Sequence, residues 1–401
     1  MTGRERILKV LARETADCIP FDIGGTDCSM MHAIPHRDVR RELGLGDDAF
    51  RCACLIQILG EPDGPLMNAL EVDAEPLSFG ARAYKSWQSP FGIEMTVPKS
   101  FGVENLPDGS AVARNASGAV THRMSAGGYY FDPVGTPLAH VTDAAQLSEF
   151  DDLFERWDYP AMYDESTDEL AARARKQYAA TDRAVVALWR LHYLQTGQLM
   201  RGYETFLCDL MIEKELAHAL LGKLHRVYLA RVETFMDAFA DAFDVVFLTD
   251  DLGTQVSGLV PPAVYKEMLC PYISEVVAAI RKRGKRIVMH SCGSVFEFIP
   301  DLIAMGIDAL NPVQVSARNM NPRDLVREFG KDIAFWGGGV NTQGAMNSPD
   351  PEVVRADVRQ RLDEYGPDAH LVFTQVHNIQ YDVPAANVLA MKDEFFKRAR
   401  S

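Results

Sequence analysis

The feature that most restricts the fold is an alternation of apolar, strand-like runs and helix-like stretches through the second half of the chain. Largely apolar runs are typical of strands buried on both faces of a parallel sheet. They occur at 184–189, 245–248, 286–289, 309–312, 333–339 and 371–374. Repeated strand–helix units imply a parallel sheet with right-handed crossovers. Their number predicts an α/β fold, a closed (β/α)₈ TIM barrel, with an open doubly wound sheet as the alternative.

The N-terminal third has a different character. From about residue 72 to residue 141, short β-like pieces alternate with Gly, Pro, Asn and Ser. This pattern predicts an antiparallel β insertion rather than a helix. We therefore expect residues 1–401 to form a single barrel domain that carries an insertion at about 72–141.

Charge and cysteine content limit the partners and the compartment. The net charge of -15 argues against nucleic acid and anionic membranes as general partners. Seven scattered cysteines suit reduced thiols better than a disulfide framework. The charged N-terminus is unlike a signal peptide, and no run is apolar enough to cross a bilayer. We expect a cytoplasmic protein that binds neither membrane nor nucleic acid.

A His-x-Cys pair ends the strand at 286–289. His290 and Cys292 are two residues apart, so both side chains point to the same side. An imidazole and a thiol form half of a borderline-soft metal site, for which zinc is the first choice. The alternative is a buried histidine beside an inert cysteine. His377 follows the strand at 371–374 and is predicted to be the third ligand, leaving a fourth position open, as a catalytic zinc requires.

Further polar residues follow the other predicted strands, where the chemistry of a barrel lies. Asp250 and Asp251 are candidate catalytic carboxylates that either complete the metal site or orient a ligand, although one of them is expected to cap the next helix. Asp22 is a candidate catalytic carboxylate or a turn cap. The residues predicted to bind the substrate at the same face are Asn311, Gln314, Gly338, Gln343, Asn378 and Gln380.

These segments resemble the uroporphyrinogen decarboxylase superfamily, and within it the cobalamin-dependent (corrinoid) methyltransferase branch. The resemblance covers nearly the whole chain, implies a (β/α)₈ barrel and rests on residues 21–26, 250–255, 289–294, 311–314, 335–339, 376–380 and 383–387. The decarboxylases share an arginine-rich N-terminal loop, whereas residues 23–28 here contain no arginine. The metal-dependent methyltransferases share H-x-C and a later cysteine, where this chain has His377.

The resemblance implies a zinc-dependent methyltransferase. It would move a methyl group between a small methylated substrate, such as an aryl methyl ether in O-demethylation, and a corrinoid. The chain contains no D-x-H-x-x-G corrinoid-binding segment, so a separate carrier protein is expected to supply the cobalamin. Barrels of this kind often pair, which makes a homodimer a further expectation.

Two other functions stay open at this point. One is a metal-free decarboxylase, a lyase acting on a small carboxylic acid with His377 and Asp22 as acid and base. The other is a non-catalytic relative that only binds a ligand or partner.

Overall fold

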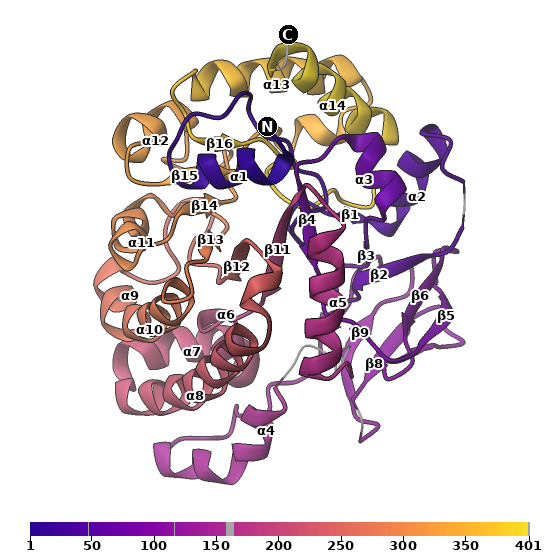
Figure 1. The fold of residues 1–401 in the computed structure, drawn as a ribbon. Coiled ribbons are helices and arrows are strands. Elements are labelled where there is room, and N and C mark those ends of the chain that lie inside the picture. Colours follow the sequence, from indigo (N-terminus) through magenta and orange to yellow (C-terminus); the bar gives the residue numbers. More distant parts are fainter. Residues whose placement is uncertain (47, 116, 158–163, 400–401) are drawn as a thin grey trace.

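A seven-stranded parallel sheet forms the centre of the protein (Figure 1). The structure is a computed structural model that describes residues 1–46, 48–115, 117–157 and 164–399. The strand order is β16-β15-β14-β13-β12-β11-β4. The bounds are β4 (Ala74–Leu77), β11 (Ala184–Trp189), β12 (Val245–Thr249), β13 (Arg286–His290), β14 (Ala309–Asn311), β15 (Ala334–Trp336) and β16 (Leu371–Val372).

The sheet curls so that one short segment contacts both of its edges. Beyond β16, Phe373 donates its N–H to the carbonyl of Pro20 (2.9 Å) and accepts from the N–H of Asp22 (2.9 Å). On the other side, the N–H of Asp73, just before β4, donates to the carbonyl of Phe21 (2.8 Å). Seven strands and this bridging segment make up the ring, so the eight-stranded barrel stays a prediction.

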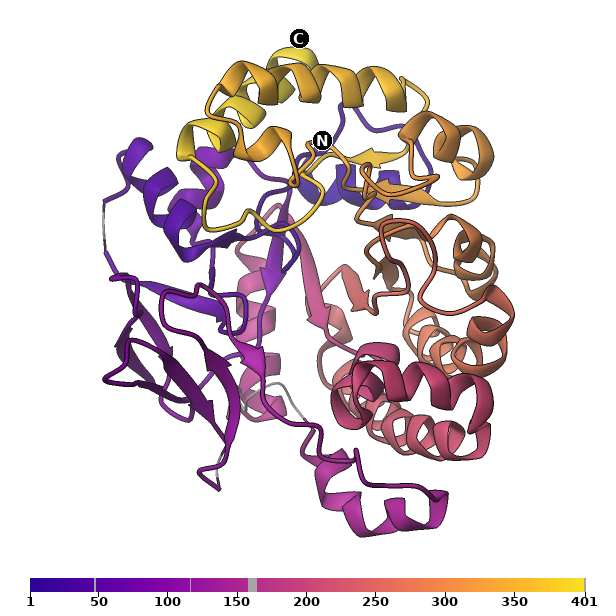
Figure 2. The same cartoon turned by 180° about the vertical axis from the view of Figure 1, so that it is seen from behind.

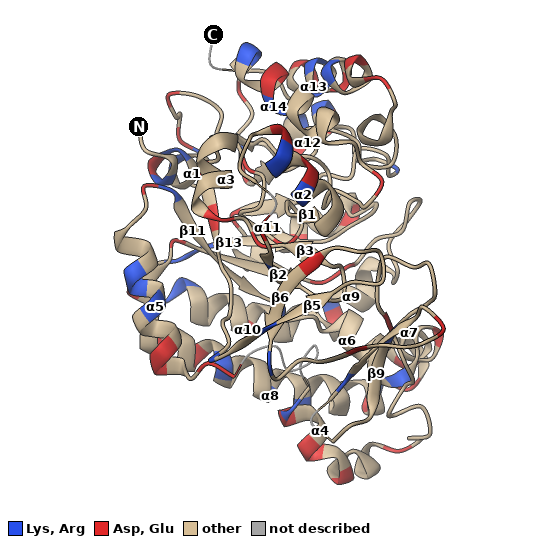
Figure 3. Ribbon diagram, turned by 90° about the vertical axis from the view of Figure 1, so that its right-hand side faces the viewer, with Lys and Arg blue, Asp and Glu red and all other residues tan. Residues whose placement is uncertain are grey.

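Helices cover the outer face of the sheet, and Figure 2 shows the same arrangement from behind. Their acidic and basic side chains lie interspersed over these helices (Figure 3). One end of the interior is closed by α1 (Gly3–Leu11), whose Ile7, Val10 and Leu11 pack with inward side chains such as Val186 and Val288. The other main helices are α5 (Thr167–Ala179), α8 (Lys214–Phe239), α10 (Cys270–Arg281), α11 (Ile299–Met305), α12 (Pro322–Phe329), α13 (Pro351–Tyr365) and α14 (Ala385–Ala399).

Shorter helices occupy the loops. These are α2 (Ala33–Glu42), α3 (Gly64–Leu70), α4 (Asp151–Glu155), α6 (Leu194–Arg201), α7 (Tyr203–Ile212) and α9 (Pro262–Met268). No helix in the described part of the chain has both the length and the apolar character that crossing a bilayer requires.

Two smaller sheets, antiparallel apart from one parallel strand pair, lie to one side of the central sheet (Figures 1 and 2). A four-stranded sheet has the order β10-β9-β8-β7, and a five-stranded sheet has the order β1-β3-β2-β6-β5. Their bounds are β1 (Met31–His32), β2 (Phe50–Cys54), β3 (Leu59–Gly60), β5 (Tyr84–Gln88), β6 (Glu94–Pro98), β7 (Gly102–Asn105), β8 (Ala111–Arg114), β9 (Val120–Met124) and β10 (Asp132–Pro133).

The start of the expected insertion needs a correction, because β4 lies within 72–141 but belongs to the parallel sheet. Glu75 and Pro76 hide this strand in the sequence. The carboxylate of Glu75 is buried because Gln177 (2.9 Å) and Thr181 (2.8 Å) donate hydrogen bonds to it. Pro76 is tolerated because β4 ends the ladder and needs fewer backbone donors.

Candidate metal centre

His290 ends β13, and a hydrogen bond to the neighbouring strand orients its ring. Nδ1 of His290 lies 2.6 Å from Oδ1 of Asn311, which ends β14. The amide nitrogen of Asn311 donates to the carbonyl of Trp336 (2.7 Å), so the amide oxygen is the end that accepts. In the neutral ring Nδ1 therefore carries the proton, and Nε2 keeps a lone pair for a ligand.

His377, in the loop after β16, is held in the same way. Its Nδ1 lies 2.6 Å from Oδ1 of Asn378, which also accepts from Nε2 of Gln380 (2.6 Å). The amide nitrogen of Asn378 donates to Oε1 of Gln57 (2.8 Å). Burial, and then the neighbouring His290, lower the pKa of His377 to about 4. At neutral pH the ring is uncharged, and its Nε2 is free to bind a cation.

Two thiols lie close to Nε2 of His290. The distance from this nitrogen to Sγ of Cys292 is 3.4 Å, and the distance to Sγ of Cys28 is 3.7 Å. Burial raises the pKa of both thiols well above the ordinary value. A bound divalent cation reverses this effect, because a coordinated thiol loses its proton.

The two neighbouring aspartates have different surroundings. Oδ1 of Asp251 lies 3.5 Å from Nε2 of His290 and accepts from the N–H of Cys292 (2.8 Å). Burial alone raises the pKa of Asp251, but His290 and the Cys292 amide hold it below its usual value. Asp250 accepts three backbone N–H groups at the start of α6, of Tyr193, Leu194 and Gln195. Asp250 is thus a helix cap, whereas Asp251 lies beside Nε2 of His290.

The donor atoms form two overlapping groups that share His290. Those of Cys28, His290 and His377 all lie within 4.8 Å of one another, and so do those of Asp251, His290 and Cys292. The predicted trio of His290, Cys292 and His377 is not itself such a group, because Cys28 takes the place of Cys292 beside the two imidazoles. Sequence reasoning missed Cys28, which is 262 residues from His290 and shares no local spacing with it.

A cavity of about 140 Å³ opens at these donors. It is also lined by Arg190, which forms an ion pair with Asp27 (2.5 Å), and by Thr249. The hydroxyl of Thr249 and Oδ1 of Asp27 are buried without a hydrogen-bond partner among the described residues. Buried polar atoms are almost always paired, so these two indicate room for a polar ligand. The nitrogen and sulfur donors and the unpaired oxygens together fit a zinc ion with a further ligand.

Several predicted site residues lie behind this cavity rather than around it. None of the six predicted substrate-binding residues is among those that line it in the described chain. Asn311, Asn378 and Gln380 belong to the hydrogen bonds behind the two histidines. Gln314 accepts from the N–H of Gly293 (2.7 Å), and exposed Gln343 accepts from Gln255 (2.9 Å).

Gly338 and Asp22 have structural surroundings. A Cβ at Gly338 would lie 2.5 Å from the hydroxyl of Tyr365, so this glycine allows close packing under the sheet. Asp22 accepts from the N–H of Gly25 (2.8 Å) and from Nε1 of Trp336 (2.9 Å), and burial raises its pKa to about 6. The structure therefore places Asp22 as a turn cap, the alternative that its position after a short strand allowed.

Comparison with known proteins gives the same fold. The curated relatives include uroporphyrinogen decarboxylases of Azoarcus sp. (strain BH72), 28% identical over 195 residues covering 46% of this chain and 49% of the relative, and of Burkholderia thailandensis, 25% identical over 206 residues covering 48% and 52%. The alignments thus span about half the length of these relatives. A methyltransferase from Methanosarcina mazei is similar in structure over 99% of both chains, with a TM-score of 0.60 at 14% identity. The sequence model of the family described as uroporphyrinogen decarboxylase (URO-D) matches residues 184–396, more than half of the chain. The chain belongs to the uroporphyrinogen decarboxylase family.

Proposed function

We propose that the protein is a zinc-dependent methyltransferase that moves a methyl group between a small methylated substrate and a corrinoid on a separate carrier protein. An aryl methyl ether is the first candidate for the substrate. The proposal treats Pro20–Asp22 as the first strand of an eight-stranded barrel, so that Cys28, His290, Cys292 and His377 all follow strand ends at one face.

The observation that carries the proposal is that two imidazoles have the same hydrogen-bond arrangement. Nδ1 of each histidine donates a hydrogen bond to an asparagine oxygen at 2.6 Å, which leaves Nε2 of each ring for a ligand. Metal-binding histidines show this arrangement almost always, since the second hydrogen bond fixes the tautomer and the ring. Thiols within 3.7 Å of one of these nitrogens add the sulfur donors that zinc favours.

The residues of this chain would have separate tasks. His290, His377, Cys292 and Cys28 are the candidate zinc ligands. A zinc ion held by these residues would supply Lewis-acid chemistry to the heteroatom that carries the methyl group. The carboxylate of Asp251 accepts a hydrogen bond from the N–H of Cys292 and so fixes the backbone there. The same carboxylate lies 3.5 Å from Nε2 of His290.

A metal-free decarboxylase is the second candidate, supported by the family and by the curated relatives. Its expected acid and base, His377 and Asp22, have different positions. His377 lines the cavity, whereas both carboxylate oxygens of Asp22 accept hydrogen bonds elsewhere. A decarboxylase of this chain would therefore need another carboxylate, and Asp251 is the one nearest to His290.

Metal analysis of the full chain separates the two candidates. We expect close to one zinc per chain in the purified protein and a large loss in Cys28→Ala and in Cys292→Ala. Cys208→Ala is the matched control, because Cys208 is exposed on α7 and distant in role from the donors. Incubation with a corrinoid protein and an aryl methyl ether should then give a methylated corrinoid. Fully active protein without metal, or release of carbon dioxide from a small acid, contradicts the methyltransferase proposal.

A further inference from the structure

A second, larger cavity adjoins the candidate metal centre. Its volume is about 270 Å³, and its lining comes from the end of β11, from α5 and from α8. Arg190 and His192, in the loop after β11, line both this cavity and the one at the metal donors. The two cavities therefore have these two side chains as a common part of their walls.

Aromatic rings form much of the wall of the larger cavity. Phe235 of α8 lies 5.8 Å from Trp189 and 5.5 Å from Phe79, measured between ring centroids. Tyr228, about two α8 turns earlier, and Leu170 of α5 also belong to the lining. Flat aromatic walls favour a planar apolar group, which stacks on them or meets them edge to face. A volume just below the usual range for drug-sized ligands suits a single ring.

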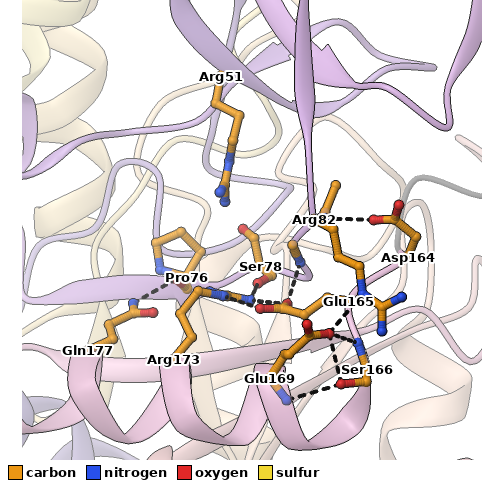
Figure 4. Close-up of polar contacts among 12 residues, drawn as sticks. Arg51, Pro76, Ser78, Arg82, Asp164, Glu165, Ser166, Glu169, Arg173 and Gln177 are labelled. Atoms are coloured by element: carbon orange, nitrogen blue, oxygen red, sulfur yellow. Dashed lines mark hydrogen bonds and ion pairs between the residues drawn. The ribbon is translucent and has the colours of Figure 1, made fainter.

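The acidic side chain in this lining is already neutralised. Among the described residues that line the cavity, Glu165 is the only acidic one. Figure 4 shows its carboxylate beside Arg173, whose guanidinium donates to both oxygens at 2.9 and 2.8 Å. The N–H of Gly80 donates a third hydrogen bond to it (2.9 Å). Glu165 therefore presents little negative charge to a ligand.

Of the two arginines in the lining, only Arg231 differs in this respect. Arg190 forms its ion pair with Asp27 at 2.5 Å, beside Cys28. Half-buried Arg231 donates only to the carbonyl of Glu155, at 3.1 Å, and forms no ion pair with any described residue. Arg231, whose guanidinium has further N–H groups to donate, thus lies beside α4. Arg190 lies beside the side chains that could bind the metal. The lining therefore combines aromatic rings with an arginine that has no ion pair among the described residues.

On these grounds we propose that the larger cavity binds the body of the methylated substrate, and that this substrate is a single-ring aromatic acid. The carboxylate lies at Arg231, the ring contacts Trp189 and Phe235, and the methylated oxygen points past Arg190 and His192 towards the donors. This assignment rests on the proposed function and adds to it the class of substrate and the residue that selects it.

Calorimetric titration of the full-length protein with two probes tests the assignment. The probes are 3-methoxybenzoate and methoxybenzene, which differ only in the carboxylate. We expect 3-methoxybenzoate to bind more tightly, and Arg231→Met to weaken its binding about ten- to a hundredfold, as the loss of a charged hydrogen bond does. The same variant should leave the binding of methoxybenzene unchanged. Arg226→Met is the matched control, since Arg226 is exposed on the same helix and does not line the cavity.

Three results would overturn the assignment: no saturable binding of 3-methoxybenzoate, equal binding of the two probes, or equal weakening by Arg226→Met and Arg231→Met. The test is independent of turnover because it needs no carrier protein. Binding that depends on Arg231 without methyl transfer to a corrinoid contradicts the proposed function and keeps the cavity assignment. Methyl transfer from an amine or a thioether without binding of the aromatic acid contradicts the cavity assignment and keeps the methyltransferase proposal.

Discussion

Replacing Asn378 by leucine tests the metal centre through a residue that is not a candidate ligand but forms a hydrogen bond with one, His377. Asn378 is 2% exposed, and its Oδ1 accepts from Nδ1 of His377 and from Nε2 of Gln380, both at 2.6 Å. Leucine removes this acceptor. The His377 proton then either stays on Nδ1 without a partner or moves to Nε2 and blocks the lone pair, and both outcomes oppose metal binding.

The size of the effect follows from these contacts. Loss of the partner behind a metal-binding histidine weakens metal affinity about ten- to a hundredfold, which corresponds to about 1.4 to 2.7 kcal/mol. Asn378→Asp keeps an acceptor at the same place, so its zinc affinity should stay closer to that of the parent protein. Asn311→Leu should reproduce the loss at His290, whose Nδ1 contacts Asn311 at the same distance of 2.6 Å.

Competition between the protein and a chromophoric chelator gives the zinc affinity of each variant. The absorption spectrum of the cobalt-substituted protein reports separately on how the ligands surround the metal. Circular dichroism establishes that each variant is folded. Equal zinc affinities for the parent protein, Asn378→Leu and Asn311→Leu would refute the argument that these amides prepare Nε2 for a metal.

Two further predictions concern stability. His36 is 1% exposed, and burial followed by Arg40 lowers its pKa to about 3, so it is uncharged when folded but gains a proton below about pH 6.5 when unfolded. The free energy of unfolding should therefore decrease as the pH drops below 6.5, by at most about 1.4 kcal/mol per pH unit. Urea titrations at pH 7 and pH 5 measure this decrease, which should be smaller in His36→Phe. Gly293→Ala should destabilise the loop after Cys292, because Gly293 has φ of +88° and an added Cβ would lie 2.4 Å from the backbone of Gly253. Gly222→Ala, in the interior of α8 with nothing within 4 Å, should instead stabilise by about 0.5 to 1 kcal/mol, and thermal unfolding compares the two.

The parallel sheet could be predicted well because its information is local. The run at 184–189 coincides with β11, and the apolar runs near 245, 286, 309, 334 and 371 each overlap a strand. Such strands are buried on both faces, so apolar content alone reveals them. β4 was hidden for the opposite reason: the partners of the buried Glu75 carboxylate, which are Gln177, Thr181 and Arg183, lie about a hundred residues away in the sequence.

The candidate site could be predicted only where residue spacing or the position of a strand gives a signal. His290 and Cys292 were found from their spacing, and His377 was placed near them by the position of its strand. Cys28 shows no such pattern, since its contact with His290 depends on how the whole ring closes. Asn311 and Asn378 were predicted to bind the substrate, as polar residues after strands. The structure shows them as hydrogen-bond partners of the two histidines, a contact that no spacing rule predicts.

The position of Cys28 has a mechanical consequence. It follows the segment that contacts both edges of the sheet, while His377 follows the last strand, and their donor atoms lie within 4.8 Å of each other and of His290. An ion held by both residues would cross-link the N-terminal segment to the last strand of the sheet. Metal loading would then make unfolding of the termini and of the centre one cooperative event, and a chelator would first destabilise the contact between that segment and that strand.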